Sequence, residues 1–137
     1  MADSRNLGLT GFPFGLSAPI VGTNGNDVLN ALADGDQLFG LGGEDTLTSN
    51  FNNTALFGGR GDDRLTTDVS VSVPGADPAD VLAVQFGGSG EDELAANVAA
   101  ISENGDATAN TLLFGGRGDD MLIADAFAGG SGFGGSA

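Results

Sequence analysis

Apolar residues recur at short, regular intervals along this chain, on both sides of Gly-rich segments. A short apolar stretch follows each Gly-rich segment, and a stretch that ends in Phe precedes most of them. Short apolar runs bounded by Gly are typical of β-strands, so we expect two strands and two turns in every period. The predicted strands are residues 28–29, 46–47, 64–65, 93–94 and 121–122 after the Gly-rich turns, and 37–39, 55–57, 81–86 and 111–114 before them.

The third and fourth periods are longer than the first two. Segment 66–73 (TTDVSVSV) alternates with a period of two residues, the pattern of a strand with one buried face. Turn-forming residues follow in segments 74–80 (PGADPAD) and 103–110 (ENGDATAN). We therefore predict longer strands in these two periods.

The Gly-rich segments share one nine-residue template, with Gly at positions 1 and 4, Asp at position 6 and Leu at position 8. About 0.05 such matches would arise by chance from this composition, so the shared register is a strong motif signal. Successive position-6 Asp residues are 18, 18, 29 and 28 residues apart, and 18 is twice nine. The segments are GTNGNDVLN from Gly22, GLGGEDTLT from Gly40, GGRGDDRLT from Gly58, GGSGEDELA from Gly87 and GGRGDDMLI from Gly115.

This pattern resembles the RTX (haemolysin-type calcium-binding) repeat, GGxGxDxUx, over residues 22–123. The chain departs from the usual arrangement because only every second turn carries the motif. We therefore expect an all-β fold: a parallel β-roll or β-solenoid of about four coils, with a column of Gly/Asp calcium-binding turns along one edge. Stacking would align the position-8 Leu residues and the Phe residues before the motifs, and we interpret both columns as core. These Phe residues are Phe39, Phe57, Phe86 and Phe114.

Composition narrows the chemistry that this single domain of 137 residues can perform. The chain has no Cys, His, Trp or Tyr, which excludes thiolate and imidazole metal sites and His-dependent catalysis. Nineteen acidic residues against four Arg and no Lys leave a net charge of -15, which argues against nucleic-acid binding. The acids repeat with the coil, whereas a catalytic pair should interrupt it, so we expect no enzymatic activity.

Stacking of the motifs would also stack their carboxylates. Positions 5 and 6 hold nine of the nineteen acids. Two unit charges 4 Å apart repel by about 4 kcal/mol at an effective dielectric near 20, which disfavours a metal-free stack. Calcium takes six to eight oxygen ligands, both carboxylate and carbonyl. We expect Gly at positions 1, 2 and 4 to adopt positive φ and turn carbonyl groups inward.

The resemblance implies calcium ions between adjacent turns, bound by position-6 Asp side chains and turn carbonyls. Five stacked turns would hold about four interlayer Ca²⁺ ions, which would change the formal charge from -15 to -7. The residues carried over by position are Gly22, Asn24, Asp27, Gly40, Gly42, Asp45, Gly58, Arg60, Asp63, Gly87, Ser89, Asp92, Gly115, Arg117 and Asp120.

The charged residues outside position 6 of the motif are interpreted separately. Arg60 and Arg117 are also expected to offset negative charge at the outer edge of the turns. The resemblance implies that a position-5 residue often contributes only its carbonyl group, so the side chains of the position-5 acids are expected to face solvent: Glu44, Asp62, Glu91 and Asp119. The acids of the opposite edge are interpreted as solvated loops, with extra ions there as the alternative: Asp34, Asp36, Asp77, Asp80 and Asp106.

The expected organisation has three parts. Residues 1–21 form an apolar N-terminal cap or docking segment, 22–123 the calcium-binding solenoid, and 124–137 a Gly/Ser-rich tail. Segment 129–134 overlays the motif with Gly134 in the Asp position, so the tail is either flexible or a degenerate sixth turn. Neither a signal peptide nor a transmembrane run is present in the sequence. The resemblance implies secretion by a type I-like route to the extracellular medium.

These features favour a calcium-binding structural protein that folds on binding Ca²⁺ outside the cell. We expect head-to-tail self-assembly into filaments or a surface matrix, with contact to a cell surface left open. The alternative is a calcium-dependent folding and secretion module of a larger toxin, protease or adhesin. An ice- or ligand-binding solenoid would need a ladder of Thr or aromatic residues, and position 7 contains none: Val28, Thr46, Arg64, Glu93 and Met121.

Overall fold

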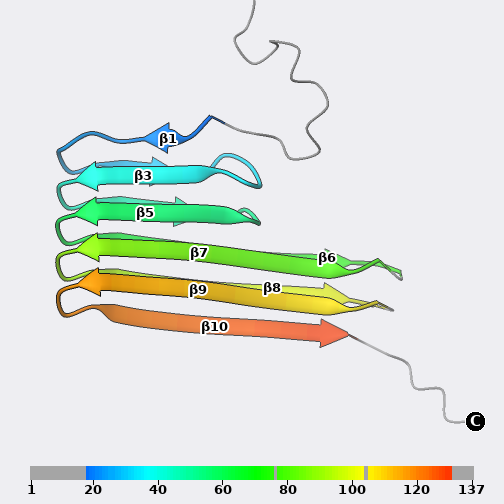
Figure 1. Ribbon diagram of the computed structural model, residues 1–137. Helices are drawn as coiled ribbons and strands as arrows, with labels where there is room; N and C mark the ends of the chain where they lie inside the picture. Colours follow the sequence, from blue (N-terminus) through cyan, green and yellow to red (C-terminus); the bar gives the residue numbers. More distant parts are fainter. Residues whose placement is uncertain (1–17, 76, 104, 131–137) are drawn as a thin grey trace, which may run out of the picture.

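The computed structural model describes residues 18–75, 77–103 and 105–130, and these residues form ten β-strands. Within them no helix occurs, so none could cross a membrane. The strands lie one above another in a stack (Figure 1). Their bounds are β1 Ile20–Val21, β2 Val28–Asn30, β3 Gln37–Gly42, β4 Thr46–Ser49, β5 Thr54–Arg60, β6 Arg64–Val73, β7 Ala79–Ser89, β8 Glu93–Ser102, β9 Ala107–Arg117 and β10 Met121–Gly130.

The strands form two parallel sheets, and the chain alternates between them. Odd strands form the sheet β1-β3-β5-β7-β9, and even strands form the sheet β10-β8-β6-β4-β2. Each odd strand and the even strand after it make one layer of a solenoid, so the two five-stranded sheets give five layers. The predicted all-β parallel roll is confirmed, with four repeat periods between the first and last Asp turns.

The position-8 Leu residues form the predicted interior ladder. The register pairs Leu29 with Leu47, Leu47 with Leu65, and Leu65 with Leu94. Leu47, Leu65 and Leu94 have no exposed surface, and Leu38 of the opposite sheet packs against them without exposure too. Since no layer can bury its apolar face alone, each Leu is covered by the layers above and below it.

The Phe residues form a column, but the prediction that it belongs to the core is wrong. Their rings stack face to face, with centroids 4.7 Å apart for Phe39–Phe57, 5.0 Å for Phe57–Phe86 and 4.8 Å for Phe86–Phe114. Side chains alternate along a strand, and Leu38 points inward, so the adjacent Phe39 must point outward. The column therefore lies on the outer face of the odd sheet, and Phe114 at its end is 48% exposed.

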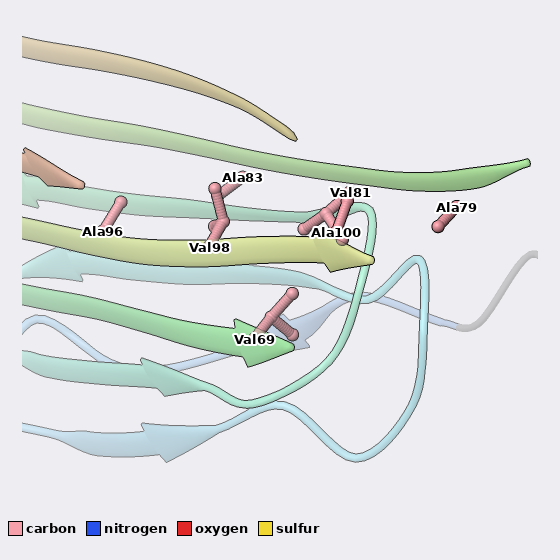
Figure 2. Close-up of a cluster of buried hydrophobic side chains, with 7 residues drawn as sticks. All are labelled: Val69, Ala79, Val81, Ala83, Ala96, Val98 and Ala100. Atoms are coloured by element: carbon pink, nitrogen blue, oxygen red, sulfur yellow. The ribbon is translucent and has the colours of Figure 1, made fainter. Parts of the chain in front are cut away.

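The stack has two widths, as the longer third and fourth periods predict. Strands β6 to β10 have ten or eleven residues, whereas β2 to β5 have three to seven. The longer part encloses a second core of Val and Ala side chains (Figure 2). Asn52, in the turn before β5, bonds to β7 where the narrow part of the stack meets the wide part. Its Nδ2 donates to the carbonyl of Asp80 at 2.6 Å, and its Oδ1 accepts from the amide of Leu82 at 3.0 Å.

The solenoid extends further toward the C-terminus than the sequence analysis placed it. β10 continues past Ile123, and its last residues Gly129 and Gly130 pair with Ile101 and Ser102 of β8. These pairs lie at the edge opposite the Asp turns, so the beginning of segment 129–134 cannot stack on the Asp column as a sixth turn. Residues 131–137, which include Gly134, and residues 1–17 of the N-terminal segment lie outside the described residues.

Candidate metal centre

The Gly/Asp turns connect each odd strand to the next even strand, so all five lie along one edge of the roll (left in Figure 1). The register aligns them layer by layer, because the residues after the Asp pair in sequence: Val28 with Thr46, Thr46 with Arg64, Arg64 with Glu93, and Glu93 with Met121. The predicted single column of Asp turns is therefore present.

Hydrogen bonds between layers orient the Asp side chains. The amide of each of the first four Asp residues donates to Oδ1 of the Asp in the following layer. The distances are 2.8 Å from Asp27 to Asp45, 2.8 Å from Asp45 to Asp63, 2.9 Å from Asp63 to Asp92 and 3.0 Å from Asp92 to Asp120. In the carboxylates of Asp45, Asp63, Asp92 and Asp120, Oδ1 is thereby fixed and Oδ2 is held at a defined place in the turn.

The second oxygen has no protein partner in the middle of the column. Oδ2 of Asp45, Asp63 and Asp92 is buried and accepts no hydrogen bond among the described residues, and these residues are only 1–2% exposed. Buried polar atoms are normally paired, so three successive exceptions at equivalent positions require an explanation. A cation bound between the layers would pair all three oxygens.

Gly at position 1 makes room for this oxygen. A methyl group built on Gly40 would collide with Oδ2 of Asp45 and would lie 2.6 Å from the carbonyl oxygen of Gly58 in the next layer. Gly87 shows the same relation to Asp92 and to the Gly115 carbonyl, also at 2.6 Å. A carboxylate oxygen and a carbonyl oxygen of adjacent layers thus converge at one place, which is the donor chemistry that a hard cation prefers.

The electrostatics point the same way. Burial raises the pKa of Asp63 from 3.8 to about 6; the hydrogen bond from the Asp45 amide lowers it, and the nearby Asp92, Asp45 and Asp62 carboxylates raise it further. Burial also raises the pKa of Asp92, with the carboxylates of Asp120 and Asp62 adding to the effect. Ionisation of these groups is therefore unfavourable in the protein alone, and positive charge between the layers would reverse that.

The donor set suits calcium rather than a transition metal. No group of three or more acidic, His or Cys side chains able to hold a metal ion occurs in the described part of the chain. An ion in this column would therefore take carboxylates from adjacent layers and complete its shell with turn carbonyls. Oxygen-only coordination that includes backbone carbonyls is typical of Ca²⁺. The residues present fit calcium.

The backbone conformation of the motif Gly residues differs from the prediction at position 1. Positions 2 and 4 take positive φ, as at Gly59 (120°) and Gly61 (115°), but the position-1 Gly58 does not. The expectation of positive φ at position 1 is wrong, because that Gly is needed for the space beside the Asp carboxylate. Leu41 stands at position 2 of the second motif with φ 82°, a conformation that non-Gly residues rarely adopt.

The first turn differs chemically from the inner turns. Both the amide and the hydroxyl of Thr23 donate to Oδ2 of Asp27, at 2.6 and 2.9 Å. Gly25 does not adopt positive φ, and its amide donates to the Thr23 hydroxyl at 3.1 Å. The Asp27 carboxylate therefore already has protein donors. The sequence analysis treated the five Asp residues as equal. The first motif has Thr23 at position 2 instead of Gly, and this difference could have indicated that its turn is distinct.

The remaining predicted residues are also placed. At position 3, Gly42 is buried and Ser89 is half-buried, whereas the other three residues are exposed: Asn24, Arg60 and Arg117. The position-5 acids are all exposed, as expected: Glu44, Asp62, Glu91 and Asp119. Some position-5 side chains also link layers, a contact that sequence reasoning missed: Asp62 accepts the amide of Glu91 at 2.8 Å, and Asn26 accepts that of Glu44 at 2.9 Å.

At the edge opposite the Asp turns, the prediction of a solvated loop is wrong for one acidic residue. Asp36 was expected in a solvated loop, but it has no exposed surface. Its Oδ2 accepts the amides of Leu32 and Ala33 at 2.7 and 2.9 Å, so the side chain closes the turn before β3. The other acids of that edge are exposed, as expected: Asp34, Asp77, Asp80 and Asp106.

Comparison with known proteins agrees with this geometry. The family model of the RTX calcium-binding nonapeptide repeat (four copies) matches residues 21–56, 52–68 and 111–130. These ranges contain the turns of Asp27, Asp45, Asp63 and Asp120, and the turn of Asp92 lies between them in the same column. No curated protein and no solved structure matches the chain.

Proposed function

Because this chain carries RTX calcium-binding nonapeptide repeats stacked in a parallel β-roll, we propose that it is a secreted structural protein that folds when calcium binds between its Asp turns. The observation that carries the proposal is the set of three buried Oδ2 atoms, on Asp45, Asp63 and Asp92, without a hydrogen-bond donor. RTX repeats imply calcium binding and are typical of secreted proteins.

Calcium dependence of folding follows from the state of the carboxylates. In the unfolded chain each Asp is solvated, whereas in the roll three of them are buried beside one another. Desolvation and mutual repulsion therefore oppose folding when no cation is present. A bound Ca²⁺ would supply the missing positive charge, so its binding free energy becomes folding free energy. Secretion through a type I-like route fits this behaviour, because the chain would fold only where calcium is abundant.

A structural role fits the fold better than catalysis. RTX repeats are binding and structural elements, and the same Asp-to-Asp hydrogen bond recurs between all successive layers of the column. The roll also ends in strand edges at both faces of the stack, with β1 and β2 at one end and β9 and β10 at the other. Such edges pair readily with other strands. Head-to-tail self-assembly into filaments or a surface matrix is therefore part of the proposal.

A calcium titration followed by far-UV circular dichroism tests the folding proposal. We expect a coil-like spectrum in chelator, a cooperative gain of strand signal with Ca²⁺, and a much weaker response to Mg²⁺, which requires tighter octahedral geometry. Isothermal titration calorimetry on the same samples counts the ions. A strand spectrum that is unchanged between chelator and millimolar calcium at neutral pH would contradict the proposal.

A further inference from the structure

The two ends of the stack are unfinished in complementary ways. At the β1–β2 end, Val21 is 54% exposed. At the β9–β10 end, Phe114 and Leu122 are 48% and 44% exposed. The register shows why: Val21 is aligned with Phe39 in the Phe column, and Phe114 is the last member of that column. Each end exposes side chains that are covered by a neighbouring layer inside the stack.

The hydrogen bonds of the Asp column are unfinished in the same complementary way. Each of the first four layers donates an Asp amide to Oδ1 of the Asp in the next layer. In the described ranges, the amide of Asp120 has no acceptor, and Oδ1 of Asp27 has no donor. Backbone bonds repeat the pattern: the amide of Met121 donates to the Asp92 carbonyl at 2.8 Å, and that of Thr46 to the Asp27 carbonyl at 2.8 Å. The amide of Val28 is the equivalent donor at the first layer, and the carbonyl of Asp120 is the equivalent acceptor at the last.

We propose that the β9–β10 end of one molecule stacks on the β1–β2 end of a second copy, in the register that relates adjacent layers within one molecule. Phe114 then covers Val21 of the second copy, and Leu122 covers its Leu29. The amide of Asp120 donates to Oδ1 of the second copy's Asp27, so the Asp column continues across the joint. This inference rests on the assembly part of the proposed function and defines the faces, the register and the partner.

The lengths of the strands restrict the contact to the edge with the Asp turns. β1 and β2 have two and three residues, whereas β9 and β10 have eleven and ten. The second copy therefore covers Leu113, Phe114 and residues 121–123, and it leaves the distal part of β10 uncovered. Phe127, which is 58% exposed in that distal part, lies outside the joint. The contact joins two different surfaces, so it is heterologous and propagates into open chains rather than a closed dimer.

The experiment compares Phe114→Asp and Val21→Asp with the matched control Phe127→Asp by sedimentation velocity in millimolar calcium. We expect the wild type and Phe127→Asp to form a concentration-dependent series of oligomers. Phe114→Asp and Val21→Asp each block one face, so we expect the concentration for half-association to rise by about tenfold or more, which is about 1.4 kcal/mol. An equimolar mixture of these two variants retains one intact pair of faces and should give dimers and nothing larger.

Circular dichroism of the same samples separates a failure to fold from a failure to associate. If Phe114→Asp does not fold, Val21→Asp alone decides: added to the wild type, it should terminate chains and shorten them. A wild type that is folded and monomeric in calcium would overturn the inference while leaving calcium-dependent folding intact, and would indicate that the chain covers its own ends. Equal loss of association in Phe127→Asp, or no dimers in the mixture, would also overturn it.

Discussion

Asp63→Asn should change the stability of the roll in opposite directions with and without calcium. Asn has nearly the same shape as Asp and keeps Oδ1, which accepts the Asp45 amide at 2.8 Å. It replaces the buried Oδ2, which has no hydrogen-bond donor, with an amide nitrogen and removes the negative charge. The substitution therefore tests the carboxylate charge rather than the packing of the turn.

The size of the effect follows from the pKa of Asp63. Burial raises that pKa from 3.8 to about 6 in the folded protein, so the folded state resists ionisation. A shift of about two pKa units corresponds to about 3 kcal/mol at 1.36 kcal/mol per unit. Because the pKa is higher in the folded state, protonation of Asp63 favours folding. This stabilisation is fully present below pH 3.8 and is lost as the pH rises through 6. At pH 7.5 in chelator, Asp63→Asn should be more stable than the wild type by up to about 3 kcal/mol.

With calcium the sign reverses. An amide nitrogen cannot bind Ca²⁺, so Asp63→Asn loses one ligand atom and one negative charge from the column. The midpoint of the calcium titration should rise by about tenfold or more, equivalent to about 1.4 kcal/mol. The wild type should therefore be less stable than the variant in chelator and more stable in millimolar calcium.

Circular dichroism measures both arms. Strand signal is followed in chelator from pH 4 to pH 8, and then against calcium concentration at pH 7.5. Asp62→Asn is the matched control: it removes the same charge from an exposed neighbour and keeps the oxygen that accepts the Glu91 amide. The reasoning is refuted if Asp63→Asn is also the less stable protein in chelator at neutral pH, or if Asp62→Asn shows the same reversal.

Three further substitutions, two of them with a matched control, test the turns, the ladder and the outer column. Gly58→Ala should abolish the cooperative response to calcium, because its methyl group collides with the Asp63 carboxylate. Gly25→Ala should leave the titration midpoint unchanged, because Gly25 does not adopt positive φ and the added methyl group would make only an ordinary van der Waals contact with the Thr23 hydroxyl, at 3.7 Å. Leu65→Ala should cost about 2–5 kcal/mol in calcium by chemical denaturation, and Leu32→Ala, 76% exposed, should cost less than about 0.5 kcal/mol. Phe86→Ala interrupts the ring stack on both sides and should cost about 2 kcal/mol in the same assay, without a change in the number of bound ions. Equal losses of stability in Leu65→Ala and Leu32→Ala would contradict the assignment of the Leu ladder to the core. A smaller number of bound ions in Phe86→Ala would contradict the separation of the Phe column from the metal site.

The sequence alone determined the register of the stack. A repeat that returns Gly, Asp and Leu to the same place can bury its Leu residues only if successive coils lie one above another, so the Leu ladder and the Asp column follow from spacing. The longer strands of the third and fourth periods follow from alternation in segment 66–73. These features are local or periodic, and such patterns can be recognised in the sequence without knowledge of the tertiary contacts.

The tertiary structure decided which side of a strand each column faces and which oxygen atoms remain without partners. Adjacent residues such as Leu38 and Phe39 are both apolar, so only packing against the opposite sheet placed one inside and the other outside. Thr23 donates to Oδ2 of Asp27, and Asp36 closes its own turn, because contacts between residues three or four apart depend on the path of each turn. The chemistry of a side chain is written in the sequence, but its burial and hydrogen-bond donors are set only when the layers are in contact.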